Sequence, residues 1–133
     1  MDKIEYLHWD GNQLTHHLEY RNILIEKLTP IMQALHDQYA VQGWKGTLDG
    51  EGLAEYAVDE FELVTDGNRW LGFSVVIPWF LTEKVVTEEF IGGFNTAEAI
   101  TILKAIAKVA DANRILVGTR AAPGGKHRGL SKL

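Results

Sequence analysis

The sequence has no cysteine among its 133 residues. This excludes a disulfide scaffold, a thiolate metal site and a thiol nucleophile, and it fits a reducing compartment. No run of apolar residues is long enough to span a bilayer, so we expect no membrane partner. The first residues, Met1-Asp2-Lys3, lack the basic and then apolar pattern of a signal peptide. We therefore expect a cytoplasmic protein, or a component of a particle that is assembled in the cytoplasm.

Positive charge is scarce over most of the chain, and the net charge at pH 7 is −5. Five of the 13 Lys and Arg residues and none of the 18 Asp and Glu residues lie in residues 114–133, which leaves residues 1–113 at −10. Such asymmetry indicates either contact with an anion or an acidic partner, or a solvated basic tail beside an acidic body. No strand combines basic and aromatic residues as a nucleic-acid reader does, so we do not expect nucleic acid as a partner.

Histidine and serine occur without the spacing of a metal or catalytic centre. Zinc ligands on a helix lie three or four residues apart on one face, whereas His16 and His17 are adjacent and face apart. Ser74 and Ser131 lack the context of a nucleophile elbow. We therefore predict no metal site and no activated serine.

The first half of the chain predicts a strand and then helix. Residues 3–9 are predicted to form a short strand that ends at the turn signal Asp10-Gly11-Asn12. Pro30 lies inside the helical pattern that follows, which predicts a kink or two successive helices. That pattern consists of apolar residues at steps of three, four and seven: Leu14, Leu18, Ile25, Leu28, Met32 and Leu35. A loop around Trp44 is predicted by four glycines: Gly43, Gly46, Gly50 and Gly52.

The second half predicts three strands, a helix and a last strand. The strands are expected at residues 53–65, 69–81 and 85–94, with a hairpin turn at residues 66–68 and a bulge at Gly92-Gly93. Asn95 and Glu98 have the spacing of a capping box and start a helix that is expected to stop near Asn113. Residues 114–119 form an apolar strand, and residues 126–133 start a further helix or form a tail. We therefore predict an α+β fold in one domain, residues 1–133, with a central, mainly antiparallel, twisted sheet flanked by helices.

This order of elements resembles the GNAT superfamily of N-acetyltransferases, in particular its small phage-encoded members. The match covers about residues 55–132, and the first 54 residues match in pattern only. Residues 86–91 (VTEEFI) look like the family's fourth strand, and residues 99–113 resemble the helix after it. Residues 114–119 (RILVGT) look like the fifth strand, and residues 124–132 (GGKHRGLSK) resemble the helix that begins after the acetyl group's site.

The resemblance implies where acetyl-CoA would bind. In the family, the fourth strand holds the pantetheine, and a loop of type Arg/Gln-x-x-Gly-x-Gly/Ala binds the pyrophosphate at a helix N-terminus. The matching residues here are Phe90, Ile91, Gly92, Gly93, Asn95 and Thr96. The loop is several residues shorter, has no Arg or Gln, and Asn95 is expected to cap the amides that a phosphate needs. We therefore expect no cofactor, with acetyl-CoA as the ligand if the protein is active.

The resemblance also implies a general base on the fourth strand, which would be Glu88 or Glu89. Strand alternation puts these two side chains on opposite faces. The alternative is that one is an exposed strand residue and the other a paired structural carboxylate. The Tyr that serves as general acid in the family has no counterpart here, since no Tyr follows Tyr56. The family's last two strands also have no matching segment before Leu133.

Two segments are candidates for contact with other molecules. The run Pro78-Trp79-Phe80 leaves at least one large ring outward, which predicts a sticky patch. Lys126 and Arg128 follow two glycines and either grip phosphate or an acidic partner, or begin a solvated helix.

We therefore expect a degenerate GNAT-like protein without catalysis that acts through protein–protein contacts. A phage virion or accessory component, in a homo-oligomer or a larger assembly, is the expected setting. The alternatives are an acetyl-CoA-dependent N-acetyltransferase, and a small inhibitor of a host protein whose acidic body imitates nucleic acid.

Overall fold

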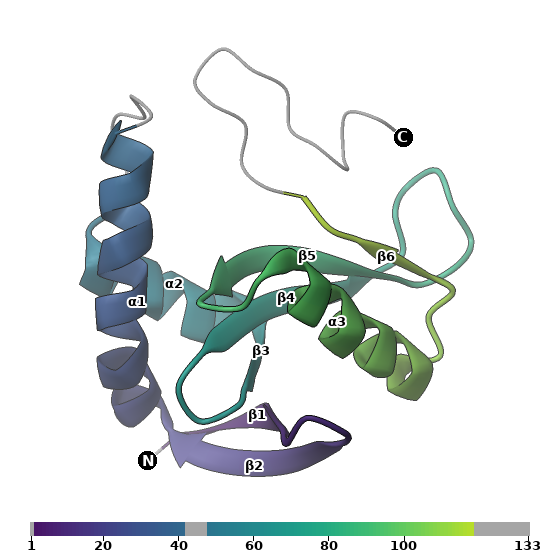
Figure 1. The fold of residues 1–133 in the computed structure, drawn as a ribbon, viewed down its shortest axis with the longest axis horizontal. Coiled ribbons are helices and arrows are strands. Elements are labelled where there is room, and N and C mark those ends of the chain that lie inside the picture. The colour runs from purple at the N-terminus through teal and green to yellow at the C-terminus, as the bar shows by residue number, and fades with distance from the viewer. Residues whose placement is uncertain (1, 42–47, 119–133) are drawn as a thin grey trace.

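The fold was examined in a computed structural model, which describes residues 2–41 and 48–118 (Figure 1). Within these residues the chain has α+β architecture, as the sequence predicts. The elements in chain order are β1 (Lys3–Trp9), β2 (Leu14–Tyr20), α1 (Arg21–Val41), α2 (Gly50–Glu60), β3 (Glu62–Thr65), β4 (Trp70–Val76), β5 (Val85–Gly92), α3 (Thr96–Ala110) and β6 (Arg114–Leu116). No helix among them is long and apolar enough to cross a membrane.

The strands form one mixed sheet in the order β2-β1-β3-β4-β5-β6. Three neighbouring pairs are antiparallel, namely β1–β2, β3–β4 and β4–β5, which confirms the predicted mainly antiparallel sheet. The pairs β1–β3 and β5–β6 are parallel, and each is joined by a helical crossover. The sheet is therefore flanked by helices that come from both crossovers.

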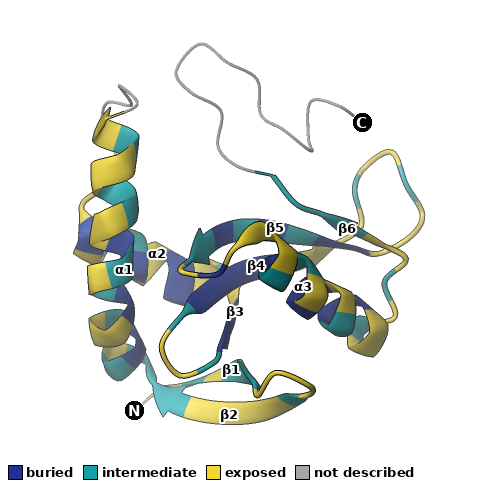
Figure 2. Ribbon diagram, in the orientation of Figure 1, coloured by how far each residue is buried: buried dark blue, intermediate teal, exposed yellow. Residues whose placement is uncertain are grey.

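Two hydrophobic cores lie on opposite faces of this sheet (Figure 2). One packs Leu24 and Leu28 of α1 and Ala54 of α2 against Leu63 and Trp70. The other packs α3 against β4 and β5 through residues that include Leu71, Val86, Ile102 and Leu103. Adjacent residues of one strand serve both cores, since Leu63 faces α1 and α2 whereas Val64 faces α3.

The predicted helix from Leu14 onward is wrong for its first seven residues, which form β2. Leu14 and Leu18 are four apart, and that step fits a strand as well as a helix, because four is a multiple of two. β2 pairs along its whole length with β1, from Lys3 opposite Tyr20 to Trp9 opposite Leu14. The backbone hydrogen bonds of β2 are therefore made to β1 in a hairpin and not within a helix.

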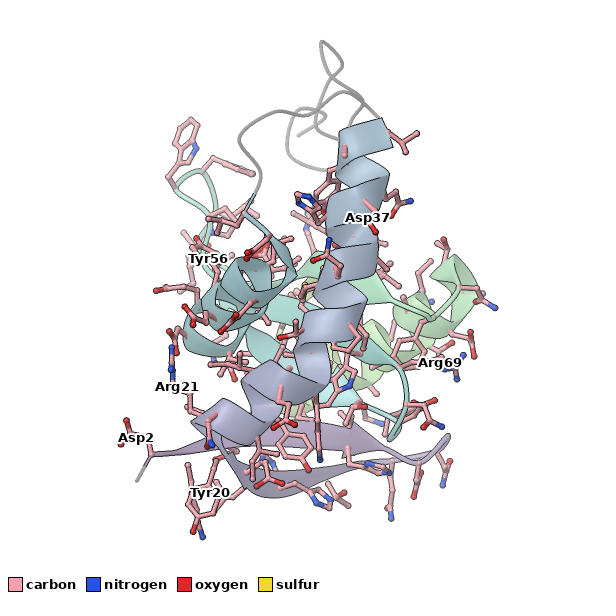
Figure 3. All side chains as sticks on the ribbon, turned by 90° about the vertical axis from the view of Figure 1, so that its left-hand side faces the viewer. Asp2, Tyr20, Arg21, Asp37, Tyr56 and Arg69 are labelled. Carbon is pink, nitrogen blue, oxygen red and sulfur yellow. The ribbon has the colours of Figure 1, made fainter. Side chains whose placement is uncertain are left out.

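One helix, α1, runs from Arg21 to Val41 with Pro30 inside it, so the alternative of two successive helices is wrong. The start of α1 is tied to the end of α2 by Arg21. Its Nε and Nη2 each donate to a carboxylate oxygen of Asp59 at 2.7 Å. Figure 3 shows Arg21 between the start of α1 and α2. This pair raises the pKa of Arg21 and lowers the pKa of Asp59.

The predicted strand over residues 53–65 is also wrong in its first part, which belongs to α2. Asp49 caps this helix, because its side chain accepts a hydrogen bond from the Gly52 amide at 2.8 Å. Gly50 is buried within α2, and a Cβ there would lie 2.7 Å from Oε1 of Gln33 on α1. Gly50 therefore allows close packing of two helices, and both Gly50 and Gly52 belong to α2 and not to the predicted loop. Residues 42–47 of that loop lie outside the described part.

From residue 62 onward, the helices and strands of the structure are of the predicted types, although the strands are shorter than predicted. β4 and β5 end at Val76 and Gly92, and β6 covers three residues of the predicted 114–119. The capping box of α3 is present as predicted, whereas its C-terminal cap is Asp111, not Asn113. The expected bulge at Gly92-Gly93 is instead found near Glu89, and residues 126–133 lie outside the described residues.

Candidate functional site

The candidate site is a cleft at the place where β5 and β6 stop pairing. The two strands pair only from Val85 to Thr87, opposite Arg114 to Leu116, while β5 continues to Gly92. Leu35 and Tyr39 of α1 approach the continuing part of β5, and Gly118 follows β6 there. These residues and 88–91 line a cleft of about 90 Å³.

A β-bulge in β5 sets the positions of the two predicted bases. Phe73 of β4 is opposite Glu88, and its neighbour Gly72 is opposite Phe90, so Glu89 is the extra residue. Glu88 is buried, with 6% of its surface exposed, and lies opposite a residue of the α3-side core. Glu89 is half-buried and accepts a hydrogen bond from the Ser74 hydroxyl at 3.1 Å. Both residues line the cleft.

The residues predicted to hold a cofactor divide into two groups. Phe90 and Ile91 line the cleft together with the two glutamates. Gly92 and Gly93 lie at the end of β5, and Asn95 and Thr96 begin α3. Gly92 is needed for packing, because a Cβ there would lie 2.5 Å from Cγ2 of Ile31.

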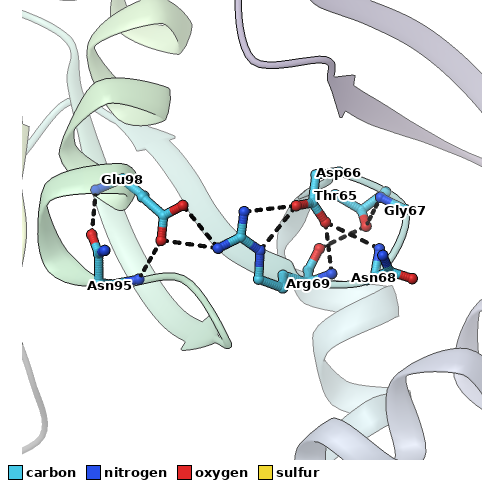
Figure 4. A network of polar contacts seen from close by, with 7 residues as sticks. All are labelled: Thr65, Asp66, Gly67, Asn68, Arg69, Asn95 and Glu98. Atoms are coloured by element: carbon cyan, nitrogen blue, oxygen red, sulfur yellow. Dashed lines mark hydrogen bonds and ion pairs between the residues drawn. The ribbon is translucent and has the colours of Figure 1, made fainter.

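Two backbone amides at the start of α3, those of Asn95 and Glu98, already have internal partners (Figure 4). The Asn95 side chain accepts from the Glu98 amide at 2.8 Å, and the Glu98 carboxylate accepts from the Asn95 amide at 3.0 Å. The Glu98 carboxylate thus takes the place that an anionic ligand takes at a helix N-terminus.

Arg69 joins this helix start to the β3–β4 turn (Figure 4). Its Nη1 donates to both Glu98 oxygens at 2.8 and 2.9 Å, and its Nε donates to Asp66 at 2.9 Å. The guanidinium also stacks on Phe94, with 4.4 Å between Cζ and the ring centroid. The cation at this corner therefore has two carboxylate partners from the chain itself.

Both carboxylates of this network have lowered pKa values. The Asn95 amide and then Arg69 lower the pKa of Glu98. Burial alone raises the pKa of Asp66, but the backbone amides of Arg69 and Asn68, together with the Arg69 side chain, outweigh it and lower the pKa. Both groups are therefore anionic at neutral pH, and they repel a phosphate that approaches the start of α3.

The residues predicted for partner contacts lie on the β4–β5 connection. Trp79 is 94% exposed and Phe80 43% exposed, and their rings meet edge to face with 5.4 Å between centroids. Val76 and Ile77, which precede them, are exposed as well. Lys126 and Arg128 lie outside the described residues.

Sequence reasoning missed Tyr39 and Arg69. Tyr39 lies four residues after Leu35 on α1, and this helical step brings both to the cleft. The Tyr that serves as general acid in the GNAT family lies near the end of the chain, so the family pattern did not point to Tyr39 on α1. The signal for Arg69 was its place directly after the predicted 66–68 turn, although its partner Glu98 is 29 residues away.

Within the described residues there is no group of three or more His, Cys, Asp or Glu side chains that could hold a metal ion. Comparison of the chain with protein-family models, with curated proteins and with solved structures finds no match.

Proposed function

We propose that this chain is a protein-binding module of GNAT-like descent without catalysis, and that its β4–β5 connection makes the main contact. The observation that carries this proposal is the exposure of Trp79, at 94%, next to Phe80 and Ile77. Large rings dominate the energy of interfaces, and replacing such a residue by Ala often costs about 2 kcal/mol or more. The partner is another protein chain, and a phage virion or accessory complex is the setting we propose.

The cleft supports the loss of catalysis. Its volume of about 90 Å³ is small, because pockets for drug-sized ligands measure roughly 300–1,000 Å³. The capping box occupies the Asn95 and Glu98 amides at the start of α3, and the charges of Asp66 and Glu98 oppose a diphosphate there. Pantetheine and pyrophosphate therefore both meet obstacles within the described part of the chain.

Affinity purification of the full chain from its native source tests the proposed contact. Trp79→Ala removes the exposed ring, whereas Val41→Ala alters an equally exposed residue on α1, which is 89% exposed, and serves as the matched control. We expect Val41→Ala to retain, and Trp79→Ala to lose, the same stoichiometric protein partner. An identical set of bound proteins for both variants contradicts the proposal.

An acetyl-CoA-dependent N-acetyltransferase is the second candidate, because buried Glu88 lies in a cleft with Tyr39 at a β-bulge. In this candidate, Glu88 or Glu89 acts as general base. A thermal-shift titration decides between the candidates, since a ligand at 100 times its Kd adds about 2.7 kcal/mol of stability. A shift with acetyl-CoA that Glu88→Gln retains but that Gly92→Val abolishes favours the enzyme. No shift at millimolar acetyl-CoA removes it.

A further inference from the structure

The two faces of the sheet are covered unequally (Figure 1). α1 and α2 pack on one face, and the other face carries α3 alone among the described elements, packed against β5 and β6. Six strands at about 4.8 Å spacing span roughly 24–29 Å, whereas a helix with its side chains is about 10 Å wide. The β1–β2 half of the α3 face therefore has the width for one more helix.

Two hollows lie along this half, between α3 and the β1–β2 hairpin, and together they are called the trough below. Its first part is a hollow of about 640 Å³ between the first turns of α3 and the residues from His8 to Gly11. Its second part is a hollow of about 270 Å³ between the last turns of α3 and residues of β1 and β2. Glu98, Ile102, Ile106 and Val109 line the two parts in turn, and their steps of four, four and three place them on one side of α3.

The two ends of the trough differ in chemistry. Asp10, Asp66 and Glu98 line the first part, where Arg69 is the one cationic Lys or Arg side chain among the described lining residues. The second part is mainly apolar and is lined by residues that include Leu7, Leu14 and Val75, while Glu5, Glu62 and His16 add polar groups to its lining. Val109 at its rim is 72% exposed and adds apolar surface to this part.

Charge favours one kind of occupant. The backbone amides of Gln13 and Asn12 lower the pKa of Asp10, and the pKa values of Asp66 and Glu98 are lowered as described above. At neutral pH the first part thus holds three carboxylates against one guanidinium. Residues 1–113 carry −10 in total, so the surrounding field also attracts a cation.

We propose that the trough is a docking site for an amphipathic α-helix of a partner protein. The apolar side of that helix lies on Leu7, Leu14 and Val109, and Lys or Arg residues at one end reach Asp10 and Asp66. Helix-in-groove recognition uses apolar anchors at this kind of spacing, and rim charges add specificity and speed of association. The site goes beyond the proposed function, because Trp79 and Phe80 do not line the trough.

The test is a titration of the ¹⁵N-labelled full chain with a synthetic amphipathic Leu/Lys helical peptide. We expect chemical-shift changes along the trough, at residues such as Leu14, Phe73 and Ile106. Val109→Lys is expected to weaken binding about tenfold, equivalent to ~1.4 kcal/mol. Val41→Lys, which adds the same charge at an exposed valine of α1, is expected to leave binding unchanged. A peptide with Glu in place of Lys is expected to bind about tenfold more weakly.

Several results overturn the inference. Equal effects of Val109→Lys and Val41→Lys show that the peptide does not use the trough. Concentration-dependent shifts along the trough without peptide assign it to a second copy of the chain. Loss of peptide binding in Trp79→Ala moves the site to the β4–β5 connection, which contradicts the trough while leaving the proposed function intact. Because Val109 is exposed, both lysine variants are expected to have the wild-type Tm, which is measured alongside.

Discussion

At Gly72 the absence of a side chain lets Phe90 cross β4. A Cβ built on Gly72 would lie 2.2 Å from Cε1 of the Phe90 ring, and this position is directly opposite Phe90 at the bulge. No ordinary rotamer change of a buried ring clears such an overlap without moving its neighbours. Gly72 therefore determines where the Phe90 ring lies, and with it the strand that lines the cleft.

We expect Gly72→Ala to destabilise the protein by about 1–3 kcal/mol, because the extra methyl overpacks the core. Urea unfolding followed by circular dichroism measures the loss. Phe90→Leu in the same chain provides the control, since a smaller side chain leaves room for the methyl. The double variant should lose less than the sum of the single variants. Additive losses contradict the proposed overlap.

The Asp66–Arg69–Glu98 network predicts how stability depends on pH. The folded pKa values of both carboxyls lie below the ordinary values of 3.8 for Asp and 4.5 for Glu. The network therefore contributes fully above the unfolded pKa values, at about pH 5 and higher. Its contribution is lost as pH falls further, through the lowered pKa values of the folded state.

We expect Arg69→Met to have a flatter stability curve between pH 6 and pH 3 than the wild type, as measured by urea unfolding at each pH. The backbone amides around Asp66 and Glu98 remain, so part of the acid dependence is retained. Lys84→Met removes a positive charge outside this network and should leave the slope unchanged. Equal slopes for the wild type and Arg69→Met contradict the role given to this ion pair.

Residue patterns predicted the α3 start but not the network around it. The capping box was readable because Asn95 and Glu98 are three residues apart, and the bonds that define it are local. The pairing of Arg69 with Glu98 depends on how the β3–β4 turn meets α3, which no local pattern records. The same reason hid the place of Tyr39 beside Glu88 and Glu89 in the cleft.

At the scale of elements, the predictions succeeded where one period was clear. The strand at residues 69–81, the strand at residues 85–94 and the helix after Asn95 were found, since β-branched runs and a 3.6-residue stripe left little choice. β2 was read as helix because Leu14 and Leu18 fit both periods. α2 was read as strand because its two glycines hid the helical step of Ala54, Ala57 and Val58, which are buried together with Gly50.

The C-cap residue of α3, Asp111, has an unfavourable backbone conformation that a substitution can relieve. Asp111 has φ 56° and ψ 44°, in the left-handed region where glycine has no Cβ penalty. Its carboxylate also lies at the negative end of the helix dipole. We expect Asp111→Gly to raise the free energy of unfolding by about 0.5–1 kcal/mol, measured by urea unfolding. Asp111→Ala removes the carboxylate but keeps a Cβ in the same conformation, so it should gain less than Asp111→Gly, and a gain of equal size in both variants contradicts the backbone explanation.

At the scale of the whole molecule, the two hydrophobic cores lie on opposite faces of one sheet and share its strands. Leu28 and Leu103 are both fully buried, the first on the α1 side and the second on the α3 side. The strands between them carry residues of both cores in alternation, as Leu63 and Val64 do. Loss of either core therefore exposes one face of strands that the other core needs, and the two cores should not unfold separately.

We expect Leu28→Ala and Leu103→Ala each to cost about 2–5 kcal/mol, and each to lower the midpoint of a single unfolding transition. Near-ultraviolet dichroism, which follows aromatic packing, and far-ultraviolet dichroism, which follows secondary structure, should give the same midpoint in every variant. Val41→Ala, at an 89% exposed position, should change stability by less than about 0.5 kcal/mol. Two separate transitions in either core variant would show that the two faces fold as independent units, and the prediction of one domain over residues 1–133 would then be wrong.

If the two cores unfold in one shared transition, a helix docked in the trough between α3 and β1–β2 stabilises the α1 side as strongly as the side it touches.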